Sequence, residues 1–283
     1  MDIKDLGTYA VNTWCLGCGN FAILNTIKSV LKNLKEDGIP LENIVLVSGI
    51  GCHAKIVDYI NLNSFYSIHG RVVPVAEAIK ISKPDLKVIG FAGDGDAYGE
   101  GLEHLIFAAK RNIDITMIIH NNRVYGLTTG QYTPTSPLGF KGRSTPYGVK
   151  EFPLNPLDVM LSSGATFIAR GFSLNLELLK RIFKEAILHK GFSIVDVLQV
   201  CVTFYNMYDY YNKRVYELKD HNSRDYNQAL NKIREWDYNQ DNKIPLGIFY
   251  KKDMPTYEEN FKFEYLDEKD REEKIKNILN KFI

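Results

Sequence analysis

Five apolar runs rich in β-branched residues recur along the sequence, and polar or amphipathic segments separate them. Each run is about as long as a strand and is apolar on both faces, which is typical of strands buried within a parallel sheet. The runs are NIVLVSG (43–49), LKVIGFAG (86–93), DITMIIH (114–120), ATFIARG (165–171) and FSIVDVLQV (192–200). This series limits the folds open to the chain more than any other feature.

Amphipathic helices are expected between these runs. In EGLEHLIFAAKRN (100–112), apolar residues follow helical spacing at Leu102, Leu105, Ile106 and Ala109. The segment LELLKRIFKEAILHKG (176–191) ends in a lysine and a glycine, as helices often do. The alternation of strands and helices predicts an α/β fold with a doubly wound, mainly parallel sheet.

Two stretches depart from this alternation. Residues 126–156 are rich in Gly, Pro, Ser and Thr, which predicts a long ordered loop over a site. After residue 203 the composition becomes polar and aromatic, so we divide the chain into a main domain, 1–202, and a C-terminal extension, 203–283. The extension ends in an expected amphipathic helix, which packs either on its own domain or on a partner; its apolar face carries Ile275, Ile278, Leu279 and Phe282.

Charge and hydropathy bound the setting of the protein. Lys and Arg number 35 against 34 Asp and Glu, so no net field attracts nucleic acid or an anionic membrane. No signal segment or long apolar span is visible, and we expect a cytoplasmic protein that is not bound to a membrane. In that compartment Cys15, Cys18, Cys52 and Cys201 are expected as metal or cluster ligands or as buried apolar residues, not as two disulfides.

Chemically distinctive residues follow the predicted strands. Cys52 follows the first, Asp94 the second, Asn122 the third and Cys201 the last. The carboxyl ends of parallel strands share one edge of a sheet, where ligands bind in open α/β folds. We therefore expect these residues along a single rim.

The segments GDG and NN suggest a magnesium diphosphate site on that rim. Asp94 of GDG and Asn122 of NN stand 28 residues apart on adjacent strand ends. The glycines allow close approach of a phosphate, a helix N-terminus offers free amides, and carboxylate and amide oxygens suit Mg²⁺. Either segment alone is more simply explained as a turn or loop, because Gly and Asn are common there. Their combination favours the metal site.

The sequence around these segments resembles that of the β subunit of 2-oxoacid:ferredoxin oxidoreductases. The resemblance spans about residues 7–257, and it rests on WCLGCGN, GIGCHAK, IHGRVVPVAEAIK, GDGDAYGEGLEHLIF, IIHNNRVYGLTTGQYTPTSP, GATFIAR and IPLGIFY. It implies a sheet of the thiamine diphosphate-binding type. It also implies that Asp94, Asn122 and the Val124 carbonyl hold Mg²⁺, and that the cofactor is lined by Ile50, Gly51, Cys52, His53, Gly95, Asp96, Gly126 and Leu127. Separately, His69 precedes an expected helix, and we expect it to approach the cofactor.

The resemblance also gives the cysteines a use. It implies that Cys15, Cys18, Cys52 and Cys201 ligate one 4Fe-4S cluster, and we expect Gly17 and Gly19 to allow a tight turn in the first pair. Zinc is the rival, since four thiolates also suit that ion, although a structural site of this kind usually has two Cys-x-x-Cys pairs. The resemblance further implicates Lys55 and Leu127 in contact with the substrate; a lysine facing solvent is the alternative for Lys55.

The implied enzyme is incomplete in one chain. The glutamate that activates thiamine diphosphate belongs to a pyrimidine-binding domain, which would come from an α subunit in a heterodimer or a dimer of heterodimers. The implied reaction is the oxidative decarboxylation of 2-oxoacids such as pyruvate and 2-oxoglutarate to acyl-coenzyme A, with electrons passed to ferredoxin. Two alternatives are a non-redox thiamine diphosphate-dependent decarboxylase subunit and a non-catalytic diphosphate-binding module.

Overall fold

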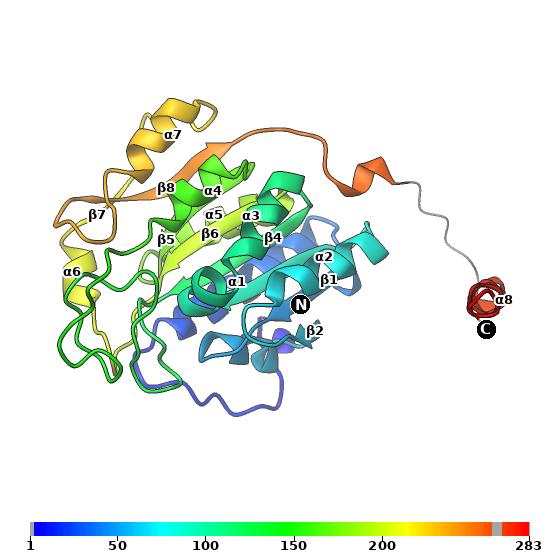
Figure 1. Ribbon diagram of the computed structural model, residues 1–283, viewed down its shortest axis with the longest axis horizontal. Coiled ribbons are helices and arrows are strands. Elements are labelled where there is room, and N and C mark those ends of the chain that lie inside the picture. The colour runs from blue at the N-terminus through cyan, green and yellow to red at the C-terminus, as the bar shows by residue number, and fades with distance from the viewer. Residues whose placement is uncertain (1–2, 262–267, 283) are drawn as a thin grey trace.

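The protein forms one eight-stranded sheet between two layers of helices in the residues that its computed structural model describes, 3–261 and 268–282 (Figure 1). The strand order is β2-β1-β3-β4-β6-β5-β8-β7. The strands are β1 (Ile44–Ser48), β2 (Asn63–Tyr66), β3 (Lys87–Gly93), β4 (Ile115–Asn121), β5 (Phe167–Phe172), β6 (Ser193–Leu198), β7 (Val215–Glu217) and β8 (Ile244–Lys251). The helices are α1 (Asn20–Glu36), α2 (Val72–Ser82), α3 (Leu102–Arg111), α4 (Pro156–Ser162), α5 (Leu176–Leu188), α6 (Tyr208–Asn212), α7 (Tyr226–Ile233) and α8 (Glu268–Leu279).

The five strands predicted from apolar runs are confirmed as β1, β3, β4, β5 and β6. These five are mutually parallel where they pair, and β8 joins β5 in the antiparallel direction. The predicted doubly wound, mainly parallel α/β sheet is therefore confirmed. Every residue of β4, β5 and β6 is buried, as their continuous apolar character requires.

Helices cover both faces of the sheet and form two cores. One core joins α1 and α5 to the sheet through side chains such as Ile27, Leu31 and Ile182. The other joins α2, α3, α4 and α7 to the opposite face, with Leu105 of α3 and Met160 of α4 at its centre. Both predicted helices exist, and Leu105 and Ala109 face this second core, while Leu102 and Ile106 are partly buried at its margin.

The residues after 203 do not form a separate layer. They supply β7 and β8 to the common sheet, and the IPLGIFY segment lies within β8. In the last helix, Ile275, Ile278 and Leu279 are exposed, and so is Phe282, which lies beyond the end of α8 and not on its expected face. Packing of this apolar face on its own domain or on a partner stays a prediction.

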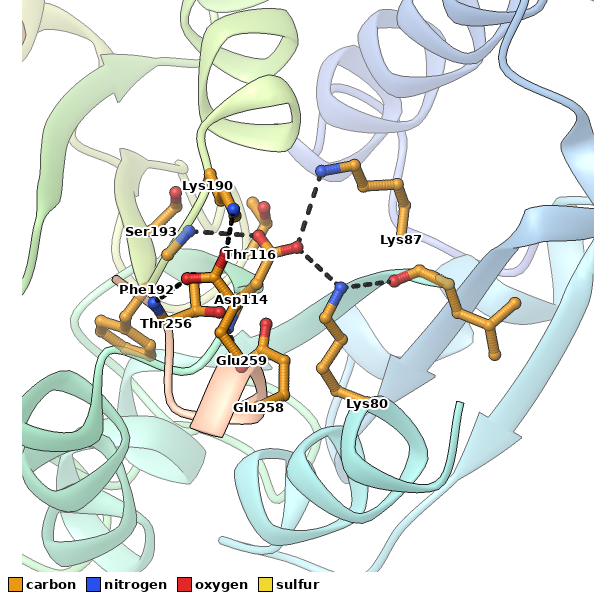
Figure 2. Close-up of polar contacts among 12 residues, drawn as sticks. Lys80, Lys87, Asp114, Thr116, Lys190, Phe192, Ser193, Thr256, Glu258 and Glu259 are labelled. Carbon is orange, nitrogen blue, oxygen red and sulfur yellow. Dashed lines mark hydrogen bonds and ion pairs between the residues drawn. The ribbon is translucent and has the colours of Figure 1, made fainter. Parts of the chain in front are cut away.

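Hydrogen bonds and ion pairs connect Glu258 and Glu259 of the C-terminal segment to residues near the amino ends of β4 and β6 (Figure 2). Buried Lys80 of α2 donates to Asp114 Oδ2 at 2.7 Å, and Lys87 stands 3.7 Å from the same oxygen. The backbone amide of Asp114 donates to Glu258, and Lys190 pairs with Glu259. These contacts hold residues 258–259 against the amino end of β4.

The carboxyl edge carries the predicted loop. No helix or strand lies between β4 and α4, and residues 126–156 form a long ordered loop that lies near the N-terminal segment in Figure 1. None of the helices in the described part of the chain is long and apolar enough to cross a membrane.

Candidate functional site

Two adjoining pockets open at the carboxyl ends of β1, β3, β4 and β6. These strands are neighbours and run parallel, so the loops that follow them meet at one edge. The first pocket, called here the diphosphate pocket, lies over β1, β3 and β4, and the second, the cysteine pocket, adjoins it. Cys52, Asn122 and Gly126 line both. The single rim predicted from the sequence is confirmed.

The diphosphate pocket gathers every residue that was predicted from the sequence to contact thiamine diphosphate or Mg²⁺. Their roles stay predictions, but their proximity is a property of the fold. The residues are Ile50, Gly51, Cys52, His53, His69, Asp94, Gly95, Asp96, Asn122, Val124, Gly126 and Leu127.

Asp94 directly follows β3, and the two oxygens of its carboxylate have different hydrogen-bond partners. Oδ2 accepts hydrogen bonds from the Thr133 hydroxyl at 2.5 Å and the Thr135 hydroxyl at 2.9 Å. Oδ1 accepts a longer hydrogen bond, 3.3 Å, from the backbone amide of Asn122. Burial raises the pKa of Asp94 to about 6 although these bonds oppose the rise. A cation near Oδ1 would favour the charged carboxylate, so the donor set fits a hard divalent ion.

Asn122 follows β4, and the backbone conformation of the next residue, Arg123, sets its position. Arg123 has a left-handed backbone with φ of 63°, which is costly for a residue with a side chain. Its buried guanidinium donates to Thr135 O at 2.7 Å and to Tyr238 O, and these contacts oppose that cost. The turn brings Asn122 Oδ1 to 3.0 Å from the Val124 amide, at the wall of the pocket.

Asp96 and two histidines form the opposite wall. Asp96 accepts the Gly70 amide at 2.5 Å and stands 3.2 Å from His53 Nε2 and 3.3 Å from His69 Nδ1. A Cβ at Gly49 would lie 1.8 Å from the Asp96 carboxylate, so only glycine fits beneath it. The segment Gly95–Glu100 forms a wide π-helical turn before α3 begins, instead of the direct helix start that the sequence suggested.

The cysteine pocket brings together all four cysteines of the chain. Cys15, Cys18, Cys52 and Cys201 line it and are free thiols. Gly17 has φ of 81° and lets the Cys18 amide reach Cys15 O at 3.0 Å, which confirms the predicted turn. A Cβ placed on Gly126 would lie 3.7 Å from both the Cys52 and Cys201 sulfurs.

Burial raises the pKa of two of these thiols, Cys18 and Cys52. It raises the pKa of Cys18 to about 11, and the three other cysteines raise it further while a hydrogen bond from the Asn20 backbone lowers it. Burial also raises the pKa of Cys52, which nearby Lys55 lowers. Thiolate ligands therefore need a positively charged group among them. In residues 3–261 and 268–282, no three Cys, His, Asp or Glu side chains converge as ligands of a single metal ion.

The two residues implicated in substrate contact lie in different pockets. Lys55 lines the cysteine pocket and donates to the Thr13 hydroxyl at 2.9 Å. Leu127 lines the diphosphate pocket and is 48% exposed. Lys55 is partly exposed and its hydrogen bond to Thr13 is accessible to solvent, so the substrate contact and the solvent-facing alternative both remain predictions.

Sequence reasoning missed three residues that organise the site. Thr133 and Thr135 belong to the loop TPTS and hold Asp94 from 39 and 41 residues away. Gln199 receives a hydrogen bond from Asn122 and donates one to Cys18. Nothing in their local spacing marks them, although their position in the long loop and before Cys201 was a usable signal.

Comparisons with known proteins agree with this geometry. Residues 49–197 match the family of the thiamine pyrophosphate enzyme C-terminal binding domain, and 201–264 match the C-terminal part of the pyruvate ferredoxin oxidoreductase β subunit. The chain is 42% identical over 265 residues to the 2-oxoacid:ferredoxin oxidoreductase β subunit of Saccharolobus solfataricus, covering 88% of this chain and 85% of that protein. It is 42% identical over 261 residues to a subunit of the same name from Aeropyrum pernix, covering 87% and 80%.

A solved structure extends the likeness to three dimensions. The 2-oxoglutarate:ferredoxin oxidoreductase from Magnetococcus marinus, with 2-oxoglutarate, coenzyme A and succinyl-CoA bound, superposes with a TM-score of 0.86 at 35% identity. The match covers 92% of this chain and 88% of that chain. With a thiamine pyrophosphate-binding fold and curated relatives over most of its length, the chain belongs to the β subunits of the 2-oxoacid:ferredoxin oxidoreductases.

Proposed function

We propose that this chain holds thiamine diphosphate with Mg²⁺ in the diphosphate pocket and one 4Fe-4S cluster in the cysteine pocket. With an α subunit, it would oxidise 2-oxoacids to acyl-coenzyme A and carbon dioxide and reduce ferredoxin. The observation that carries the proposal is the shared wall: the four cysteines and the Asp94–Asn122 pair line pockets that have Cys52, Asn122 and Gly126 in common. Electrons would then travel a short path.

Each group has a fitting set of side chains. Asp94 Oδ1, the Asn122 amide oxygen and the Val124 carbonyl are hard donors for Mg²⁺, and four thiols supply the soft ligands of an iron-sulfur cluster. When bound, thiamine diphosphate provides the electron sink for decarboxylation and the cluster accepts electrons singly. The Lys55 ammonium, which lines the cysteine pocket, would pair with a substrate carboxylate.

The test is the visible spectrum of the enzyme. The chain would be purified with its α subunit without oxygen and examined before and after adding a 2-oxoacid with coenzyme A. We expect a brown protein that bleaches when both are present. A colourless protein with bound zinc would contradict the cluster, and carbon dioxide release without an electron acceptor would favour a non-redox decarboxylase.

A pair of variants isolates the metal site. Asp94→Asn should abolish magnesium-dependent binding of thiamine diphosphate, measured by calorimetry, because the charged ligand is lost. Asp85→Asn is the matched control, since Asp85 is exposed just before the same strand, at its opposite end. Equal binding by both variants would remove Asp94 from the proposed metal site.

A further inference from the structure

Gln199 lines the cysteine pocket and contacts Asn122, which lines both pockets, but it belongs to neither predicted ligand set. It follows the last residue of β6, is 1% exposed, and precedes Val200 and Cys201. Its backbone amide donates to Asn121 O at 3.0 Å, which extends the pairing of β6 with β4 by one residue. The side chain is therefore fixed beside the end of β4 and beside the cysteine pocket.

The amide group of Gln199 has all its hydrogens in use. Nε2 donates to Val200 O at 2.6 Å and to Cys18 Sγ at 3.4 Å. Oε1 accepts from Asn122 Nδ2 at 2.9 Å. These contacts connect a proposed cluster ligand to a proposed magnesium ligand through one side chain.

The Val200 carbonyl sets the direction of this chain of bonds. A carbonyl can only accept, so the NH₂ group of Gln199 must face it and Oε1 must face Asn122. Asn122 must then present its own NH₂ group to Gln199. Its carbonyl oxygen Oδ1 is left on the other side, near the Val124 amide and the wall of the diphosphate pocket.

We propose that Gln199 is a positioning residue for both cofactors: it turns the Asn122 carbonyl oxygen toward the cation and donates a hydrogen bond to the Cys18 sulfur of the cluster. The inference rests on the proposed function. Hydrogen bonds to cluster sulfurs favour the more negative, reduced state and so raise the reduction potential. A fixed ligand orientation strengthens metal binding, because less freedom is lost when the ion binds.

Two substitutions separate these roles. Gln199→Glu keeps an acceptor for Asn122, but as a carboxylate it has no hydrogen to donate, and as an acid its single hydrogen is taken by Val200 O. Gln199→Leu loses the acceptor and the donor together. A role limited to filling space would change stability without moving a potential or a magnesium affinity selectively.

The experiment is a redox titration of the assembled enzyme, followed by the electron paramagnetic resonance signal of the reduced cluster. We expect both variants to have a lower potential than the wild type, by about 59 mV for a tenfold shift of a one-electron equilibrium. Calorimetry with Mg²⁺ and thiamine diphosphate should show roughly tenfold weaker binding for Gln199→Leu, the loss of about one hydrogen bond to an ion ligand. Gln199→Glu should bind at least as tightly as the wild type.

Controls keep this inference distinct from the proposed function. Gln228→Leu makes the same chemical change at an exposed position of α7 and should move neither quantity. A wild-type enzyme without iron defeats the proposed function itself. An iron-containing wild type whose potential and magnesium affinity are both unchanged in the Gln199 variants overturns the inference. If a variant loses iron, the calorimetry still decides, since equal affinities for wild type and Gln199→Leu overturn it.

Discussion

The carboxylate of Asp94 is held from one side by two hydroxyl groups of the long loop. Thr133 and Thr135 both donate to Oδ2, and Thr135 also lies 3.0 Å from Asn121 Oδ1. We expect Thr135→Val to weaken magnesium-dependent binding of thiamine diphosphate about tenfold, since a hydrogen bond to a charged group contributes roughly 1.5–3 kcal/mol. Calorimetry measures this, and Thr135→Ser should restore the affinity. Weak binding by the serine variant would indicate that the methyl group matters instead.

A substitution of Lys55 tests whether this residue contributes to the choice of substrate. Its ammonium lies in the cysteine pocket, within 2.9 Å of the Thr13 hydroxyl, and is available to a second carboxylate. Lys55→Met should raise KM more for 2-oxoglutarate than for pyruvate, because only the dicarboxylate loses a second ionic contact. Steady-state kinetics with both substrates measure the difference. An equal rise for the two substrates would argue against contact with the distal carboxylate.

At the scale of the elements, α2 and β4 meet through a buried ion pair away from the site (Figure 2). Lys80 is 3% exposed and also donates to Leu86 O at 2.9 Å. Lys80→Met should lower the free energy of unfolding by about 3 kcal/mol. The largely buried Asp114 carboxylate would then keep only Lys87, 3.7 Å away, as its cationic partner. Lys87→Met is the control, since Lys87 is more exposed and 3.7 Å from Asp114, and should cost about 1 kcal/mol or less. Equal losses in urea unfolding would contradict this difference.

The elements also show how far the sequence could be interpreted. Strands such as β4 were predictable because every residue is buried, which makes a continuous apolar run. The strand β2 was not, because all four of its residues are exposed at the sheet edge. The long loop was predicted from composition, but its anchors were not: Thr135 and Arg123 act through contacts with Asp94 and Tyr238 that no local pattern encodes.

The proximity of the proposed ligand residues was predictable for another reason. Asp94, Asn122 and Cys52 each follow a recognisable strand, and parallel pairing brings strand ends together. The orientation of the Asn122 side-chain amide depends on the Val124 backbone amide, which donates to Oδ1, and also on Gln199, 77 residues later, whose own orientation is set by the carbonyl of Val200. Sequence order could indicate which residues meet, whereas hydrogen bonds at the sheet edge decide which atom of each residue faces the pocket.

On the surface of the molecule, exposed apolar side chains lie at and beside the diphosphate pocket. Ile68 is 72% exposed beside His69, and Ile50 and Leu127 are 41% and 48% exposed on the pocket itself. Soluble proteins seldom expose such groups together without a partner. An α subunit that completes the cofactor site would cover them, which agrees with the proposed heteromer.

This arrangement gives a test of assembly that is independent of catalysis. Ile68→Glu should weaken association with the α subunit at least tenfold, because a charge would enter an apolar contact, and should leave the thermal unfolding of the chain alone nearly unchanged. Leu188→Glu is the matched control: Leu188 is 45% exposed at the end of α5, where the helix has returned toward the amino edge of the sheet. Sedimentation of the mixed subunits measures both. If Leu188→Glu dissociates the enzyme and Ile68→Glu does not, the partner lies on another face, and the diphosphate pocket is completed by different means.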